Sequence, residues 1–368
     1  MEPSFSFSQQ TWQRLKKNKG AIFGLLVISL SITLSLLGYL VAPDSSPYAD
    51  LQTVEIQAKK PGYQQLFLKV PTNEKQTTAW LTQLVQGRRE AFSYIPITGY
   101  SIKGDSLSIN KYIDEDTSVV QDFSVSQLTG NNSSSLLKKN LVTKTYWLGT
   151  DKFGRDILSR LIIGTRVSLA VGLIAVIISL TIGIALGALA GYYRGRTDEV
   201  IMWLVNVTWS IPTLLLVFAI TMTLGKGFWQ IFIAVGLTMW VSVARLIRGQ
   251  VMAIKELEYI QAAKALGLSD TRIILRHILP NIMGPVMVIA ASNFATAIII
   301  EAGLSFLGIG VQPPQPSWGL MIKENYNFII THNPMLALIP GFAIMLLVLA
   351  FNLLGNGLRD AVDVRTPL

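Results

Sequence analysis

Cysteine is absent from the sequence, and charged residues are scarce. Without cysteine, neither a disulfide nor a thiolate metal site can form anywhere in the 368 residues. Charged residues make up 14% of the chain and hydrophobic residues 51%, whereas a soluble domain carries about 25% charged residues. Because so little charge is available for a water-exposed surface, the composition predicts an integral membrane protein with several spans.

The sequence also lacks the patterns that mark an enzyme. No GxxxxGK[ST] string occurs, so the chain has no phosphate-cradling loop of its own. His277 and His332 have no second ligand at metal spacing. No Ser-Lys, paired-Asp or His-rich zinc pattern stands out within the apolar runs. We therefore expect no catalytic, cofactor or metal site in this chain.

The net charge of +9 would favour nucleic acid binding only if the basic residues lay together on a soluble domain. They flank apolar segments instead: Arg14, Lys16, Lys17, Lys19, Arg194, Arg196, Arg245, Arg248, Lys264, Arg272 and Arg276. Lysine and arginine beside a span mark the cytoplasmic side of a membrane. Membrane topology therefore accounts for the charge, and no nucleic acid partner is expected.

Six apolar runs are long enough to cross a hydrocarbon core of ~30 Å as helices. They lie at residues 21–42, 167–192, 200–224, 228–247, 283–306 and 335–354. The first run is longer than the core of a signal peptide and lacks a small-x-small cleavage site, so it is expected to remain as a span. The basic residues beside the spans predict that both termini are cytoplasmic. Pro212 and Pro340 are expected to kink or locally unwind their helices.

Residues 43–146 have a different character, because β-branched and aromatic residues alternate with polar ones. Short strands are expected at 65–70, 94–97, 107–113 and 119–125, and a flexible linker at 131–135. The segment predicts a small β-rich or partly disordered extracytoplasmic insertion. It also leaves open a protein of another class, a membrane receptor with an extracytoplasmic ligand-binding domain.

Glycines recur at intervals of four in the second apolar run, at Gly183, Gly187 and Gly191. One face of that helix therefore has no side chains, and a neighbouring helix can approach it closely. We expect the neighbour to belong to this chain rather than to a second membrane subunit.

The polar stretch between the fourth and fifth runs predicts a helix-turn-helix. One face of its first helix carries residues at intervals of three, namely Leu257, Ile260, Ala263 and Leu266. Gly267 suits the left-handed position that follows a helix. Ser269 or Asp270 is expected to cap a second helix, which Pro280 ends. The pattern predicts a short rigid helix that projects from the membrane, and an ordinary cytoplasmic hairpin is the alternative.

Ala262 and Ala263 are followed by Gly267 and then by Leu279-Pro280. This spacing resembles the loop through which the membrane subunit of an ABC importer contacts its ATPase. The resemblance implies an ATPase-coupling role for six residues: Glu258, Ala262, Ala263, Gly267, Leu279 and Pro280. Gln261 stands where the family carries an acidic residue, and Glu258 is the candidate for that electrostatic role.

Two further strings narrow the resemblance. Residues 147–169 read WLGTDKFGRDILSRLIIGTRVSL and residues 304–321 read LSFLGIGVQPPQPSWGLM. Both are similar to C-type permease subunits of importers in the oligopeptide, dipeptide and nickel branch. The resemblance implies an all-α membrane fold, with six transmembrane helices of the type I ABC importer permease.

The same resemblance implies the partners and the function. The partners would be a second homologous permease subunit, two ABC ATPases that use ATP, an extracytoplasmic substrate-binding protein and the lipid bilayer. The implied function is import of di- and oligopeptides through a pathway of which this chain forms half. Nickel or another small solute is the alternative cargo.

Five residues are candidates for the outer rim or the pathway. Asp151, Arg155 and Asp156 are expected to form a charge-paired cluster that either holds an interfacial helix or makes a docking rim for the binding protein. Glu301 is acidic within an apolar run and is expected near the outer interface, where it is either wetted or in contact with peptide. Trp318 suits a membrane interface.

The predicted organisation has a cytoplasmic N-terminal segment (1–20), a first transmembrane helix (21–42), the extracytoplasmic insertion (43–146) and an interfacial segment (147–166). A five-helix permease core (167–355) with its coupling loop (248–280) precedes a cytoplasmic tail (356–368).

Overall fold

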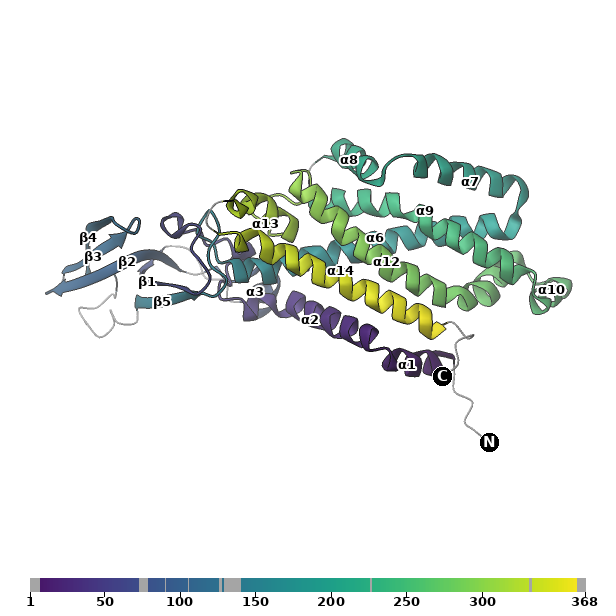
Figure 1. The fold of residues 1–368 in the computed structure, drawn as a ribbon, viewed down its shortest axis with the longest axis horizontal. Helices are drawn as coiled ribbons and strands as arrows, with labels where there is room; N and C mark the ends of the chain where they lie inside the picture. Colours follow the sequence, from purple (N-terminus) through teal and green to yellow (C-terminus); the bar gives the residue numbers. More distant parts are fainter. Residues whose placement is uncertain are drawn as a thin grey trace, which may run out of the picture. The chain divides into compact units, whose positions relative to one another are not determined.

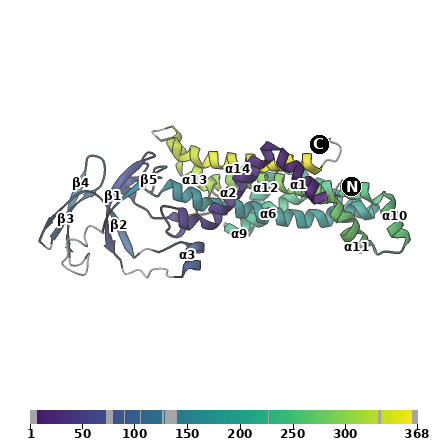
Figure 2. The same ribbon diagram turned by 90° about the horizontal axis from the view of Figure 1, so that it is seen from below.

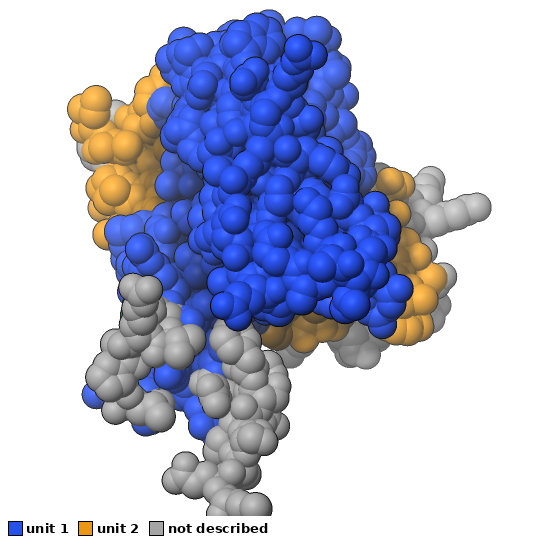
Figure 3. All heavy atoms as spheres, turned by 90° about the vertical axis from the view of Figure 1, so that its right-hand side faces the viewer, with its two compact units in different colours: residues 1–32, 168–312, 342–368 blue, residues 33–167, 313–341 orange. Residues whose placement is uncertain are grey.

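The computed structural model describes residues 7–72, 79–89, 91–104, 106–125, 128, 140–225, 227–330 and 333–362. Its contacts divide the chain into two compact units, which Figure 3 colours separately. Unit 1 comprises residues 1–32, 168–312 and 342–368, and unit 2 comprises residues 33–167 and 313–341. Each unit is therefore assembled from segments that lie far apart in the sequence.

The fold is that of a helical membrane protein with a small β insertion, as predicted (Figure 1). The long helices are α2 (Lys19–Val41), α6 (Ile157–Tyr193), α9 (Phe228–Lys255), α12 (Met283–Phe306) and α14 (Met335–Val362). Within the described part of the chain, five helices are long and apolar enough to cross a membrane, or six if one bent pair counts as a span.

Helix α6 begins earlier than its apolar run. It has 37 residues and is about 55 Å long at ~1.5 Å per residue, which exceeds a hydrocarbon core of ~30 Å. The backbone N–H of Ser159 donates to Asp156 Oδ2 at 2.9 Å, so Asp156 caps the first turn. Residues 157–166, expected to be a separate interfacial segment, therefore form the first turns of α6. Likewise, α14 runs past residue 355 to Val362.

The third apolar run is not one straight helix. It forms α7 (Gly195–Ser210) and α8 (Thr213–Leu224), which meet at a bend of 93°. Pro212 stands at the N-cap of α8 with ψ of 124°, outside the helical region. This position confirms the expected break at Pro212, since proline has no N–H to continue a helix. Pro340 differs, because α14 continues through it.

The glycine face of α6 packs against α9 inside unit 1. A Cβ on Gly183 would lie 2.4 Å from Val243 Cβ, and one on Gly187 would lie 2.5 Å from the carbonyl oxygen of Ala244. A Cβ on Gly191 would lie 2.7 Å from the carbonyl oxygen of Arg248. The expected packing within the chain is thus confirmed, and the two backbones come close because these positions carry no side chain.

The insertion is an antiparallel sheet with the strand order β4-β3-β2-β1-β5. Its strands are β1 (Tyr63–Pro71), β2 (Phe92–Lys103), β3 (Ser106–Tyr112), β4 (Ser118–Ser124) and β5 (Leu141–Tyr146). Leu68, Ile97, Leu107 and Ile109 are buried together on one face and form its core. The four predicted strands are confirmed, three of them close to their expected ranges; β2 is much longer than the expected 94–97.

Strand β5 was not expected from the sequence. It pairs with β1 from Leu68↔Leu141 to Tyr63↔Tyr146 and forms the edge strand beside β1, so this pairing joins segments that lie far apart in the sequence. The linker expected at 131–135 lies outside the described residues.

The described residues also form short helices: α1 (Phe7–Lys17), α3 (Trp80–Gln86), α10 (Glu258–Ala265), α11 (Asp270–Ile273) and α13 (Trp318–Asn325). Single 3₁₀ turns occur at Pro47–Ala49, Val54–Ile56, Leu279–Ile282 and Tyr326–Ile329, and a π-helical turn at Ile274–Ile278.

Candidate functional site

The first candidate site is helix α10, which connects α9 to the segment before α12. Ile260 and Ala263 are buried, in a cluster with Val251, Ile273 and Ile278. The opposite face of α10 is exposed and carries Glu258, Gln261, Ala262, Lys264 and Ala265. One side of the helix is therefore fixed to the bundle, while the small residue Ala262 lies on the free side.

Gly267 ends α10 in a left-handed conformation. Its φ is +78°, as predicted, and its N–H donates to the carbonyl of Lys264 at 3.0 Å. The N–H of Leu268 donates to the carbonyl of Ala263 at 3.2 Å, so the two bonds form a Schellman motif. The motif satisfies carbonyls that the helix end would leave without partners, and it fixes the direction in which the chain leaves α10.

The predicted apolar face of α10 is wrong at both ends. Leu257 is 47% exposed and Leu266 is 80% exposed, although Ile260 and Ala263 between them are buried. The helix spans only Glu258–Ala265, so these leucines occupy its two caps and leave the helical period. Together with Tyr259, 46% exposed, they give α10 a solvent-facing apolar border, which is typical of a surface that binds another protein.

The segment after Gly267 also differs from its prediction. Ser269 takes the N-cap position of α11 without a side-chain hydrogen bond. Asp270 instead accepts from the hydroxyl of Tyr192 at 2.7 Å. Pro280 does not end a helix there: it lies in the 3₁₀ turn that leads directly into α12. A 3₁₀ turn tolerates proline in its first positions, because the N–H of these residues has no intrahelical partner.

Tyr192 fixes the base of this segment to α6. Its carbonyl accepts from Lys255 Nζ at 2.6 Å, while its hydroxyl holds Asp270. Leu279 packs, half-buried, against the same core that holds Ile260. The end of α9, the start of α11 and the end of α6 are thus joined by side-chain contacts.

The second candidate site is a buried cluster of charges in unit 2. Arg155 donates to three carboxylates: Nε to Asp151 at 2.7 Å, one terminal nitrogen to Asp50 at 2.9 Å and the other to Glu324 at 2.7 Å. The guanidinium of Arg160 lies 3.5 to 3.8 Å from the same three side chains. Arg155 is 2% exposed and Arg160 is fully buried.

Burial by itself would lower the pKa of Arg155, but the charges of Asp151 and Glu324 outweigh it and raise the pKa. Removing any one of these carboxylates would leave buried charge without its partner, so the cluster is expected to hold together firmly. Asp50 and Glu324 were missed from the sequence because they lie 105 and 169 residues from Arg155.

Asp156 does not join the ion pairs. One of its carboxylate oxygens accepts from the N–H and the hydroxyl of Ser159. Burial raises the pKa of Asp156, and the bonds from Ser159 oppose that rise. Asp151, Arg155 and Asp156 are 1%, 2% and 5% exposed, so they offer no surface to a docking protein in this structure. Their contacts favour the interpretation in which ion pairs hold the start of α6.

Glu301 lies within α12 and is fully buried. It accepts from the hydroxyl of Ser305 at 2.7 Å, and Ser305 in turn accepts from the N–H of Val311 at 3.1 Å. The sequence left open that Glu301 is in contact with water, and its complete burial corrects that expectation. Through Ser305, the carboxylate is linked to the backbone of Val311, which follows the end of α12.

Trp318 is also buried, with 4% of its surface exposed. Its indole N–H donates to the carbonyl of Leu161 at 3.0 Å, and its ring lies where a Cβ on Gly164 would be 3.1 Å away. The side chain therefore anchors α13 to the first turns of α6 and is not exposed.

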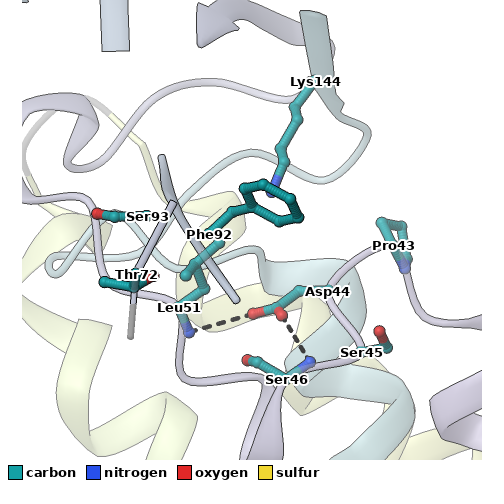
Figure 4. A pocket seen from close by; sticks show the side chains of 9 residues that line it. All are labelled: Pro43, Asp44, Ser45, Ser46, Leu51, Thr72, Phe92, Ser93 and Lys144. Carbon is teal, nitrogen blue, oxygen red and sulfur yellow. Dashed lines mark hydrogen bonds between the residues drawn. The ribbon is translucent and has the colours of Figure 1, made fainter. Parts of the chain in front are cut away.

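A cleft of about 300 Å³ opens between the exit of α2 and the sheet (Figure 4). Asp44 lines it, but its two oxygens accept from the N–H groups of Ser46 at 2.9 Å and Leu51 at 3.2 Å. Lys144 lies with its Nζ 3.3 Å from the ring centroid of Tyr94. Both charges thus already take part in local contacts, and the cleft gives no sign of a catalytic arrangement.

Two family models match the chain. The model for "Binding-protein-dependent transport system inner membrane component" matches residues 183–366, and the model for "N-terminal TM domain of oligopeptide transport permease C" matches residues 6–61. Neither of these two matches includes residues 62–182, which contain all five strands.

The chain is similar to several curated permeases. It is 43% identical over 221 residues to a glutathione transport system permease protein of Pectobacterium atrosepticum, covering 60% of this chain and 73% of the relative. It is 40% identical over 221 residues to the oligopeptide transport system permease protein of Bacillus subtilis, covering 60% and 72%. The dipeptide transport system permease protein of Alkalihalophilus pseudofirmus is 44% identical over 218 residues, covering 59% and 71%.

Among solved structures, an inward-facing form of the MetNI methionine ABC transporter matches with a TM-score of 0.46 at 19% identity. This match covers 55% of this chain and 96% of the other.

Proposed function

The chain belongs to the family of binding-protein-dependent transport system inner membrane components, and from that premise we propose that it is a permease subunit of an ATP-driven importer of di- and oligopeptides. The relatives support a peptide cargo, because their names specify oligopeptides, dipeptides or glutathione, itself a tripeptide. As a transport subunit it is not an enzyme, and partner subunits would hydrolyse ATP.

Helix α10 is the observation that carries the coupling role. Its buried side is fixed by Ile260 and Ala263, and its direction is fixed by the turn at Gly267. Its exposed side combines Ala262 with the apolar side chains of Tyr259 and Leu266. A rigid helix with one free apolar side suits a groove on an ATPase, and Glu258 would supply a carboxylate at its start.

In the proposed mechanism, α10 moves with the ATPase groove that holds it. The shared core passes this movement to α9 and α12, and Tyr192 passes it to α6. A π-helical turn and a 3₁₀ turn, the latter with Leu279 and Pro280, connect α11 to α12. Such irregular helical turns often mark a hinge, and here they would let α12 follow the movement of α10. Rocking of these helices would turn the pathway from inward- to outward-facing, and hydrolysis by the partners would reset it.

The proposed assembly contains this chain, a second homologous permease, two ATPases and an extracytoplasmic binding protein. Both termini and α10 would be cytoplasmic, in agreement with the basic residues within α1, α9 and α10. The sheet would then lie on the outer side. Because the outer charge cluster and Trp318 are buried, we assign them to holding unit 2 together rather than to docking.

Uptake in cells that lack this chain tests the proposal. Labelled di- to hexapeptides are the probes, and nickel is the control solute. We expect peptide uptake to be lost and to return with the intact gene, while nickel uptake is unchanged. Normal peptide uptake with lost nickel uptake would overturn the proposed cargo, and copurification with ATPases would separate a permease from a receptor.

A further inference from the structure

Helix α3, in the connection between β1 and β2, has an exposed apolar side. Trp80 is 71% exposed, Leu81 57% and Val85 63%. These positions and Leu84 fall on one face at the helical period, and Thr82, Gln83 and Gln86 fall on the other. Large side chains exposed on so short a helix need a partner, because water is an unfavourable neighbour for them.

Arg166 of α6 fixes where α3 lies. Its guanidinium donates to the carbonyls of Leu84 at 2.7 Å and Val85 at 2.9 Å, which belong to the last turn of α3. The same guanidinium donates to the carbonyls of Ser35 and Leu36 in α2. The guanidinium of Arg166 therefore joins α3 to the side of α2. At the C-terminal end of α3 the helix dipole places partial negative charge on the carbonyl oxygens, which favours a cation there.

These bonds set the depth of α3 along α2, which lies beside it (Figure 2). Leu36 precedes the end of α2 at Val41 by five residues, or about 8 Å at the helical rise. The outward surface of α2 at this level is apolar, with Leu36 62%, Leu40 67% and Val41 57% exposed. Since α2 is a span, α3 adjoins a surface that faces lipid.

The residues that follow α3 pack closely against the segment after α2. A Cβ on Gly87 would lie 2.8 Å from the carbonyl oxygen of Ser45 and 2.9 Å from the ring of Tyr39. The N–H of Arg88 donates to the same Ser45 carbonyl at 2.7 Å. Arg88 and Arg89 follow at the surface, so two cations stand directly beside the apolar face, as in helices that lie in a membrane interface.

We propose that α3 is a membrane-interface anchor that inserts Trp80, Leu81 and Val85 into the lipid leaflet on the side of the sheet. The occupant of its apolar face is lipid acyl chain, and a headgroup phosphate would neutralise Arg88. Tryptophan prefers this depth because its ring is apolar while its N–H is polar. The anchor would fix the β1–β2 connection to the bilayer. This proposal does not depend on which cargo is transported.

The absence of cysteine in the chain gives a direct test with single-cysteine variants carrying a nitroxide spin label. Leu81→Cys and Val85→Cys probe the apolar face, and Gln86→Cys probes the opposite face of α3. Val120→Cys on β4 is the matched aqueous control, since Val120 is 67% exposed and Val85 63%. The assembled transporter is placed in vesicles of phosphatidylethanolamine and phosphatidylglycerol.

We expect oxygen, which concentrates in lipid, to relax the labels at 81 and 85 several-fold more strongly than a water-soluble nickel chelate does. The order should reverse at 86 and 120. Labels at 81 and 85 that are as open to the chelate as the label at 120 would overturn the proposal. Shielding that appears only when an extracytoplasmic protein is added would overturn it as well, because the occupant would then be protein.

Discussion

At the scale of single residues, Gly267 determines how α10 is presented. Its φ of +78° lies in the region that disfavours side chains with a Cβ. Apart from Gly267 itself and its two chain neighbours, no heavy atom lies within 4 Å of the place where a Cβ would stand, so a substitution acts through backbone strain and not through collision. This separation makes the role of the turn testable.

We expect Gly267→Ala to strain the turn by about 1 kcal/mol and to lower the amount of peptide transported per ATP hydrolysed. Gly267→Asn is the matched control, since asparagine tolerates the left-handed region better than alanine does. Transport and ATPase rates of the reconstituted complex provide the measurement. Equal loss in both variants would show that the shape of the turn is not what matters.

At the scale of elements, the contact between α6 and α9 depends on glycine. Gly183, Gly187 and Gly191 leave room for the backbone and side chains of α9, and dispersion contacts replace the hydrophobic effect as the source of helix association in lipid. The same helix carries Tyr192, which holds the base of α10. The close contact therefore also determines where the coupling segment stands.

Gly187→Ala should destabilise the protein by about 1–3 kcal/mol, because a Cβ would be forced into a packed interface. That Cβ would lie 2.5 Å from the carbonyl oxygen of Ala244. Gly249→Ala, in α9, is the control, since nothing outside the adjoining turns of α9 lies within 4 Å of its Cβ position and alanine favours a helix. The measurement is the thermal midpoint of the purified complex. A similar fall of the midpoint in the Gly187→Ala and Gly249→Ala variants would contradict the packing argument.

At the scale of the whole molecule, unit 2 is closed by contacts between its two segments, 33–167 and 313–341. Glu324 binds Arg155, and Trp318 donates to the carbonyl of Leu161. Asn333 donates to the carbonyls of Ala58 and Lys59 at 3.4 and 3.3 Å. The loop before α14 therefore completes a unit whose other parts come from the first half of the chain.

Glu324→Gln should lower the thermal midpoint markedly, because removing one partner from a buried ion cluster costs about 3–5 kcal/mol. Glu324 is 8% exposed and faces Arg155 and Arg160. Glu115→Gln removes the same charge from an exposed pair with Lys59, where Glu115 is 83% exposed, and should change nothing measurable. Equal midpoints for the two variants would show that the buried cluster does not stabilise unit 2.

Local rules were sufficient for much of the fold. The lengths of the apolar runs predicted the long helices, because a span must match the thickness of the bilayer. Pro212 predicted a break, and Gly267 predicted a left-handed turn, because each residue restricts or permits its own backbone. Alternation predicted β1 to β4, because it reports a half-buried strand. These features depend on neighbours within a few positions, which the sequence determines by itself.

The tertiary structure decided what no local rule contains. Four features join residues from distant segments: the burial of Trp318 against α6, the partners of Arg155, the pairing of β5 with β1 and the bonds from Arg166 to α3. Even the exposure of Leu266 followed from where α10 ends rather than from its period. Charge and hydropathy identify residues that need partners, but only the folded chain brings those partners within bonding distance.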